Sequence, residues 1–430
     1  MKTSLLVIMY FVPLLLCGQI DTVYSEKYLK RSTKFAWTTL GLETFFLPGG
    51  TTSIWSAESS STLDFGPSFT PRITIGGIHF WGHVDFYVSF PLRFLRLRSV
   101  PANLENINYS HGIETGARIY PWKLRPNSIR PFFGASFKRM SFSQEQKDIN
   151  YEEGGAVWQK VIYPFQTGVS FTGQNYMITA VLHWQSSNDF EYFLTPTQTG
   201  TVEVSPLSVN VGIIKTLDLD AGIRTKEGIE QENLKHHILK KEKRLSAWYA
   251  GLGPSASFQM SESPFISNGY PFLSNDRLIG IMPDITIGRY FSRPDMNVGL
   301  SYRRFSGQLR AFDTKIQAIR NSYMLESYKF LFNWLGFVPF FGLTGSLEDL
   351  YVSVNDQKYQ EIKPAVGFIF GWDIRVTRTG TSLLRTNLRY IPNLNMNVQG
   401  EKMMFDHLEI NFIQWIYFFG RKRAYQKYSS

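Results

Sequence analysis

Apolar and polar residues alternate between residues 366 and 390, and this pattern restricts the fold more than any other feature of the sequence. Side chains of a strand point alternately to its two faces, so one face here is apolar: Val366, Phe368, Phe370, Trp372, Ile374 and Val376. After a turn at residues 377–381, Leu384, Leu388 and Tyr390 continue the alternation opposite Arg385, Asn387 and Arg389. Aromatic rows opposite arginine rows are typical of a barrel wall with lipid outside and water inside.

The first residues have the pattern of a cleaved secretory signal. Lys2 gives a basic start, an apolar run follows from Leu5 to Leu16, and Cys17-Gly18 ends the segment with small residues. The run is about a dozen residues, which is shorter than the ~20 that a membrane-spanning helix needs. Because Cys17 is the only cysteine, the mature chain is expected to have no disulfide, and lipidation of Cys17 is an open alternative.

The composition agrees with a barrel, and the charge is uneven. Aromatic residues make up 16% of the chain, and the formal net charge is +10. Basic residues gather in residues 227–244 and in the tail from Arg421. These clusters lack the interleaved aromatics of a nucleic-acid surface, so no nucleic acid is expected. They are expected to face the periplasm or anionic head groups, and a merely solvated charged surface is the alternative.

Five landmarks recur in the same order about 200 to 212 positions apart. Pro71-Arg-Ile-Thr-Ile-Gly76 corresponds to Pro283-Asp-Ile-Thr-Ile-Gly288, and Pro131-Phe-Phe-Gly134 to Pro339-Phe-Phe-Gly342. The other pairs join Trp37 with Trp248, Asp85 with Asp295, and Gly168 with Gly367. This order indicates an internal duplication.

The alternation predicts an all-β, antiparallel up-and-down barrel of about 16 strands, with 12–18 plausible, built from two duplicated eight-strand halves. The expected strands are near residues 36–46, 68–79, 84–92, 109–120, 129–142, 160–172, 176–186, 201–215, 246–259, 277–290, 295–304, 323–333, 337–354, 361–376, 382–393 and 405–419. Longer connections, such as residues 306–322, are expected on the outer side.

Two small barrels are an alternative arrangement of these strands. The last strand ends in aromatic residues, whereas residues 208–217 of the first half do not, and this difference favours a single barrel. The expected parts are a signal peptide (1–18), a periplasmic segment (19–33), one barrel (34–420) and a polar tail (421–430). Within the barrel, residues 34–217 and 246–420 are the halves and residues 218–245 a charged periplasmic linker. Ile229, Leu234, Ile238 and Leu239 give this linker near-helical spacing, so it is either a solvated connection or a short helix that docks on a partner or caps the barrel.

The polar face of the strands supplies candidate lumen-lining residues. They are Asp85, Glu114, Arg118, Arg130, Lys138, Asp295, Asn297, Arg303, Asp373, Arg375, Arg385, Asn387, Arg389, Glu409 and Asn411. Opposed charges on different strands are typical of a porin constriction, where they select solutes by size and charge. The same charges could instead pair and brace a filled interior. Arginine exceeds the acids in this set, which predicts a preference for anions if the pore is open.

Enzymatic activity is not expected. No histidine lies in a Gly-x-Ser-x-Gly or His-Glu-x-x-His context, and His183 and His407 fall at interior strand positions. The adjacent His236 and His237 lack carboxylates at metal-binding spacing. The sequence therefore predicts no catalytic residues, no metal and no cofactor.

The leader, the alternating strands, Pro131-Phe-Phe-Gly134, the segment Leu384–Tyr390 and the aromatic last strand together resemble the porin-like outer-membrane β-barrel proteins of Gram-negative bacteria. The resemblance implies an outer-membrane location, contact with outer-membrane lipid, and recognition by the barrel-assembly machinery during biogenesis. The leading functional hypothesis is a passive channel for small polar solutes. The alternative is a non-conducting barrel that acts as scaffold or partner in export or surface assembly, with a periplasmic partner at residues 218–245.

Overall fold

The computed structural model describes residues 37–424, except 57–58, 99, 102–103, 148–150, 174, 218–233, 235–236, 274–277, 333–336 and 376–379. The predicted signal peptide, Cys17, the segment 19–33 and most of the linker and tail lie outside these residues. The described chain is almost entirely antiparallel β-structure, as the sequence predicts.

The first barrel closes within the first half of the chain. Its eight strands are β1 (Trp37–Leu47), β4 (Ser68–His79), β5 (Val84–Pro91), β7 (Leu104–Ile119), β8 (Ser128–Gln146), β10 (Phe165–Thr172), β11 (Tyr176–Trp184) and β14 (Leu207–Leu217). β1 pairs with β4 along one edge and with β14 along the other, and the remaining strands complete the ring.

The second barrel closes independently. Its strands are β15 (Ala247–Gln259), β16 (Ile279–Phe291), β17 (Met296–Ala311), β18 (Thr314–Phe330), β19 (Phe337–Val354), β20 (Gln357–Arg375), β21 (Ser382–Ile391) and β24 (His407–Phe418). Sixteen barrel strands in two eight-strand halves are thus confirmed. Their closure into one barrel over residues 34–420 is wrong, because β14 returns to β1 and does not pair with β15.

The repeated landmarks occupy equivalent strands. Pro71–Gly76 lies in β4 and Pro283–Gly288 in β16, each the second strand of its barrel, and the Pro-Phe-Phe-Gly motifs lie in the fifth strands, β8 and β19. Register corrects one correspondence. Gly76 pairs with Tyr87, and Gly288 pairs with Gly299, so the counterpart of Asp85 is Asn297 and not Asp295.

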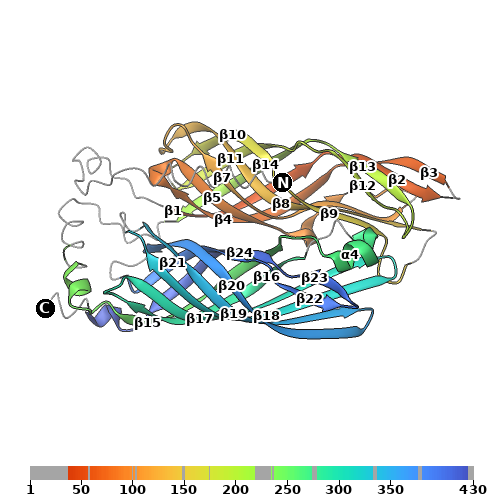
Figure 1. The fold of residues 1–430 in the computed structure, drawn as a ribbon. Helices are drawn as coiled ribbons and strands as arrows, with labels where there is room; N and C mark the ends of the chain where they lie inside the picture. The colour runs from red at the N-terminus through yellow and green to blue at the C-terminus, as the bar shows by residue number, and fades with distance from the viewer. Residues whose placement is uncertain are drawn as a thin grey trace.

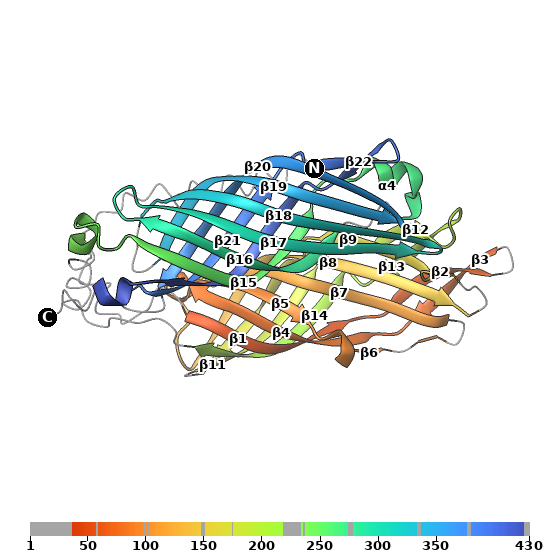
Figure 2. The same ribbon diagram turned by 90° about the horizontal axis from the view of Figure 1, so that it is seen from below.

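The two barrels lie side by side with their long axes roughly parallel (Figures 1 and 2). Short turns, such as residues 80–83 and 292–295, join strands at one end. Longer elements extend from both barrels at the other end, and we call them the platform. They are the sheet of β2 (Gly50–Ser56), β3 (Ser59–Phe65), β12 (Asp189–Phe193) and β13 (Thr199–Val204), with β9 (Ala156–Ile162), α4 (Pro264–Gly269), η3 (Pro271–Leu273), β22 (Asn395–Val398) and β23 (Glu401–Met404).

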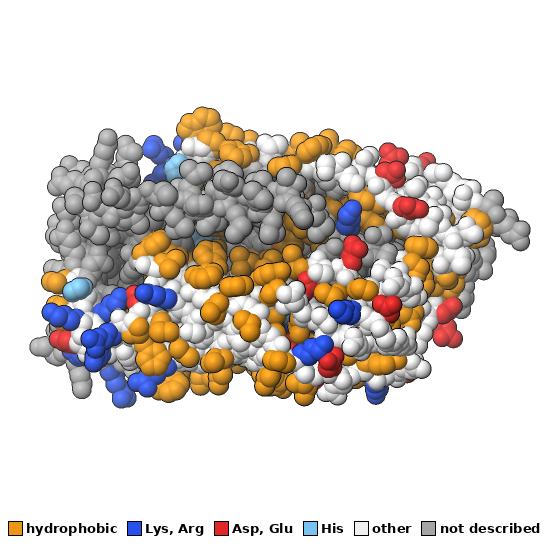
Figure 3. All heavy atoms as spheres, viewed as in Figure 1, with side chains coloured by type: hydrophobic (Ala, Val, Ile, Leu, Met, Phe, Trp, Pro, Cys, Tyr) orange, Lys and Arg blue, Asp and Glu red, His pale blue; other side chains and the backbone are white. Residues whose placement is uncertain are grey.

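The outer wall of each barrel is apolar and exposed. Outward side chains such as Leu42, Ile213, Ile287 and Leu300 are each more than half exposed, and hydrophobic side chains form a wide band between the charged ends (Figure 3). A soluble protein rarely exposes so large an apolar surface, whereas a membrane barrel requires it. No helix in the described part of the chain is long and apolar enough to span a membrane.

The barrels are joined along their walls and through the platform. Phe137 of β8 packs edge to face against Phe258 of β15, with ring centroids 4.5 Å apart. Beyond the walls, the Phe312 N–H donates to the Gly154 carbonyl at 2.8 Å, and the Glu153 N–H donates to the Phe312 carbonyl at 2.8 Å. One hydrophobic cluster contains buried platform residues of both halves, so the two halves are fixed to each other at this end.

Independent closure predicts that each half folds alone. Residues 37–217 and 246–424, refolded separately in detergent, should each show the heat-modifiable gel migration of a folded barrel, because each ring has all its strand partners. Unheated and heated samples of each half and of the whole chain provide the measurement.

The opposite pattern would identify a sixteen-strand ring. In that case only the whole chain would shift on heating, since each half would keep two unpaired edges.

Candidate functional site

Twelve of the fifteen candidate interior residues lie inside the barrels, each with at most 1% of its surface exposed. They are Asp85, Glu114, Arg118, Lys138, Asn297, Arg303, Asp373, Arg385, Asn387, Arg389, Glu409 and Asn411. Many of their contacts join strands that are not neighbours in the sheet, so these side chains cross the barrel interiors.

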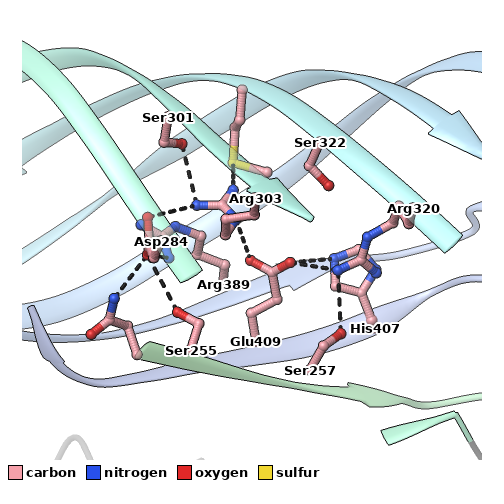
Figure 4. A network of polar contacts seen from close by, with 12 residues as sticks. Ser255, Ser257, Asp284, Ser301, Arg303, Arg320, Ser322, Arg389, His407 and Glu409 are labelled. Carbon is pink, nitrogen blue, oxygen red and sulfur yellow. Dashed lines mark hydrogen bonds and ion pairs between the residues drawn. The ribbon is translucent and has the colours of Figure 1, made fainter. Parts of the chain in front are cut away.

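Asp284 of β16 is one centre of the ion-pair network in the second barrel (Figure 4). Arg389 Nη1, from β21, lies 2.7 Å from one carboxylate oxygen, and the side-chain amide of Asn411 donates to the same oxygen at 2.8 Å. Arg303 Nη1 lies 3.6 Å from the other oxygen. Glu326 accepts from both arginines, at 2.8 Å from Arg389 and 3.2 Å from Arg303. The network therefore links five strands, β16, β17, β18, β21 and β24, across the interior.

Glu409 of β24 is the second centre (Figure 4). Its oxygens lie 2.9 Å from Arg303 Nε and 2.6 Å from Arg320 Nη2, and His407 Nε2 lies 3.2 Å away. Arg320 also faces Glu348 at 3.7 Å. Arginine is suited to this role because its planar fork can bond several oxygens at once.

A separate ion pair lies nearer the short-turn end of the same barrel. Arg385 donates to both oxygens of Asp373, at 2.7 and 2.8 Å. Its guanidinium lies 5.0 to 5.7 Å from the ring centroids of Tyr249, Tyr328 and Phe340. Cation–π contact of this kind favours a buried guanidinium, so this layer of the interior is filled by rings around one ion pair.

The mouth of the second barrel at the short-turn end is capped. Residues 237–241 are helical, so in this part of the linker the structure has the short helix and not the solvated connection that was its alternative. Leu239 and Leu245 are buried and pack in one cluster with Tyr290, Phe330 and Phe418 of the barrel. Leu234 is exposed, and residues 218–233 lie outside the described chain. The described part of the linker therefore covers the barrel end.

The first barrel has its own network. Arg118 of β7 lies 3.3 Å from Glu43 of β1 and 3.4 Å from Asp85 of β5, with its guanidinium 4.2 Å from the ring centroid of Tyr87. β1 and β7 are not sheet neighbours, so the contact between Arg118 and Glu43 spans the interior.

Glu114 of β7 is the third acid of this interior and a second centre of contacts. Tyr87 donates to it at 2.6 Å and Gln166 at 3.0 Å, while Lys138 Nζ lies 3.4 Å and His183 Nδ1 3.7 Å away. These partners come from four different strands, so Glu114 connects most of the barrel circumference.

Three candidates are placed elsewhere. Asp295 lies in the β16–β17 turn with φ 55°, and its partly exposed carboxylate bonds Lys240 at 2.6 Å. Arg130 is half-buried near the short-turn end and donates to the Lys123 carbonyl at 3.0 Å. Arg375 ends β20, and its side chain lies outside the described part. Asp295 is two residues before the inward-facing Asn297, but β17 begins only at Met296, so Asp295 lies in the turn before the strand.

Six buried acidic or basic residues of the described strands are missing from the candidates. They are Glu43, Arg72, Asp284, Arg320, Glu326 and Glu348. Arg320 was missed because residues 306–322 were expected to be a loop, whereas β17 and β18 continue to a tight turn at Phe312 and Asp313. Asp284, Glu326 and Glu348 could have been found by extending the period-two rule through their predicted strands.

The complete interior set corrects the predicted arginine excess. Among the described strand residues, seven buried Lys or Arg side chains face eight buried Asp or Glu side chains. Opposite charges thus nearly cancel. Water reaches none of these groups appreciably, since Glu43 is the most exposed of them at 3%. An eight-strand barrel is just wide enough to be filled by its own side chains, so this arrangement braces the wall.

The described residues contain no group of three or more His, Cys, Asp or Glu side chains that could hold a metal ion. His183 and His407 are buried beside Glu114 and Glu409. A substrate would have to enter the filled interior to reach either histidine, so their geometry is that of network members.

No protein-family model matches the chain, and no curated protein matches it. Among solved structures, Neisserial surface protein A is similar, with 15% identity and a TM-score of 0.28, over 40% of this chain and 96% of that one. Ail of Yersinia pestis has 9% identity and a TM-score of 0.27, over 40% and 97%. An outer membrane channel from Pseudomonas putida F1 has 8% identity and a TM-score of 0.23, over 89% and 96%. Because these TM-scores are below 0.5, the architecture rests on the strand pairing of this chain.

Removing one arginine should show how much the second-barrel network contributes to the free energy of unfolding. Arg389→Ala leaves Asp284 and Glu326 with fewer partners in a dry interior, and we expect the free energy of unfolding to fall by about 3–5 kcal/mol. Urea unfolding in lipid vesicles, followed by tryptophan fluorescence, measures it.

Arg304→Ala is the matched control, because Arg304 is exposed on the outward face of β17. Its effect should stay within about 0.5 kcal/mol. Equal losses for the two variants would contradict the bracing role.

Proposed function

We propose that the chain is a non-conducting double barrel of the Gram-negative outer membrane, and that it anchors the platform at the cell surface for surface assembly or contact with a partner. The observation that carries this proposal is the filling of both interiors by cross-barrel ion pairs. Short turns of membrane barrels usually face the periplasm and long elements the exterior, and this supports an orientation with the platform outside.

The filled interiors support an anchoring role over conduction. A porin holds its lumen charges apart around water, whereas Asp284, Glu409 and Glu114 each lie within hydrogen-bond or ion-pair distance of several partners. Opening a path would separate buried ion pairs, and each broken pair costs several kcal/mol. The helical cap around Leu239 adds a second obstruction in the second barrel.

The construction of the platform supports a surface role. The β2–β3 hairpin joins the β12–β13 hairpin through β2 and β13, so elements far apart in the sequence form one sheet. Tyr151 packs against Phe312 across the joint between the halves, with ring centroids 4.8 Å apart. Glu153 lies 3.5 Å from both Arg310 and Lys315. These partly exposed ion pairs add little stability, but the buried cluster beneath them holds the platform as one body.

A channel is the second candidate, favoured by unsatisfied polar groups in the second barrel. Both side-chain polar atoms of Asn387 and of Gln414 are buried without a hydrogen-bond partner among the described residues. They lie beside the irregular register of β21 and β24. Buried amides usually find protein or water partners, so water in this region would be the starting point of a conducting path.

Conductance in planar bilayers separates the two candidates. The refolded wild-type protein should be silent while its heat-modifiable migration shows that it is folded. Because the wild-type interiors are filled by their own side chains, no conductance is expected at either polarity or at high salt.

The double variant Arg385→Ala/Arg389→Ala identifies the path if openings occur. Steady wild-type openings whose ion selectivity changes in this variant would establish a pore lined by β21, and the anchoring proposal would be wrong.

A further inference from the structure

Outside the barrel interior, and among side chains that the structure describes, the short-turn end of the second barrel carries ten Lys and Arg residues but only two acidic ones, Glu242 and Asp295. Both acids already contact a base, at 3.3 Å from Arg244 and 2.6 Å from Lys240. Figure 3 shows Lys and Arg side chains gathered at this end and a mixture of both signs at the other. The basic residues are Lys240, Lys241, Lys243, Arg244, Arg289, Arg293, Lys329, Arg421, Lys422 and Arg423. We call them the basic collar.

Arg289 places part of this charge on the membrane-facing wall. Its neighbour Tyr290 points into the barrel, so Arg289 points outward. Its guanidinium carbon lies 5.6 Å from the ring of Trp248 and 5.5 Å from that of Phe291. Both rings are exposed, at 56% and 37%. Lys329 is also exposed and points outward. Met296 pairs with Phe291 on one side and with Lys329 on the other, so Lys329 lies two strands from Phe291 at the same level of the wall.

The remainder of the collar is fixed to the barrel. Arg421 stacks on Phe418 at 3.5 Å, and its Nε donates to the Leu245 carbonyl at 3.3 Å. Arg244 donates to the Ala424 carbonyl at 3.2 Å. The segments before β15 and after β24 therefore hold each other, and their exposed bases, including Lys422, stay beside the membrane-facing wall.

We propose that the basic collar binds the head group of an anionic phospholipid in the leaflet on the short-turn side. Exposed aromatic rings form girdles at the head-group level of a membrane barrel, and Arg289 lies between the exposed rings of Trp248 and Phe291. Guanidinium groups bond phosphate through two parallel N–H donors. The acyl chains would lie along the exposed apolar wall that contains Ile287 and Leu300. A free phosphate would not use that wall, and this favours lipid as the ligand.

Native mass spectrometry of the refolded whole chain, in micelles doped with phosphatidylglycerol or with phosphatidylcholine, tests this site. The wild type should retain phosphatidylglycerol in preference to phosphatidylcholine. Arg289→Gln/Lys329→Gln should weaken phosphatidylglycerol binding about 30-fold, and Lys329→Gln alone about fivefold, from the attraction expected of each base near a membrane surface. Arg304→Gln, on the outward face near the middle of β17, should change it less than about twofold.

Added inorganic phosphate distinguishes the sources of the anion. It should leave lipid retention unchanged, whereas displacement at equal concentration would show a site for free phosphate and overturn the proposal. Equal retention of the two lipids, or wild-type retention in the folded single and double variants, would also overturn it. The inference depends on the membrane location of the barrel but not on whether it conducts, so this result is independent of the bilayer recordings.

Discussion

The closure of each sheet at eight strands is the constraint on which the rest of the structure depends. At this strand number the interior has room for side chains and little else, yet the outward face must be apolar to meet lipid. The inward face must therefore carry the polar residues of the alternation in a space without bulk water. A buried charge is tolerated only with partners, and the cross-barrel pairs of Arg389 with Asp284 and of Arg118 with Glu43 supply them.

The same constraint separates the roles of the barrel and of its ends. Filled interiors make the walls stiff, and the chain differs most between the two ends of the barrels. At one end the platform joins hairpins of both halves over a shared hydrophobic cluster. At the other end the chain segments around Leu239 and Arg421 cap the second barrel and concentrate basic charge. The double barrel thus has two distinct faces on opposite sides of its apolar band.

The sequence predicts individual strands well because alternation is a local property. The predicted bounds of residues 68–79 and 337–354 coincide with β4 and β19. In both cases turn residues mark the ends of a run that alternates with period two. The interior residues of these strands follow from the same rule. Arg320 does not, because outward residues of β17 and β18 become polar where the strands leave the membrane, and a polar run without visible alternation looks like a loop.

Closure could not be predicted from alternation, because it depends on which edges meet. Nothing in Thr44 or Val211 shows that they face each other, although their pairing is part of what closes the first ring. The aromatic end of β24 distinguishes the last strand but does not determine what β14 pairs with. The interior charges carry better information. At one equivalent position Arg72 stands in the first barrel and Asp284 in the second, yet each interior ion pair described here joins residues of the same half. The charge at this position thus has opposite signs in the two copies, yet the charges of each copy pair among themselves, as two separately closed barrels require.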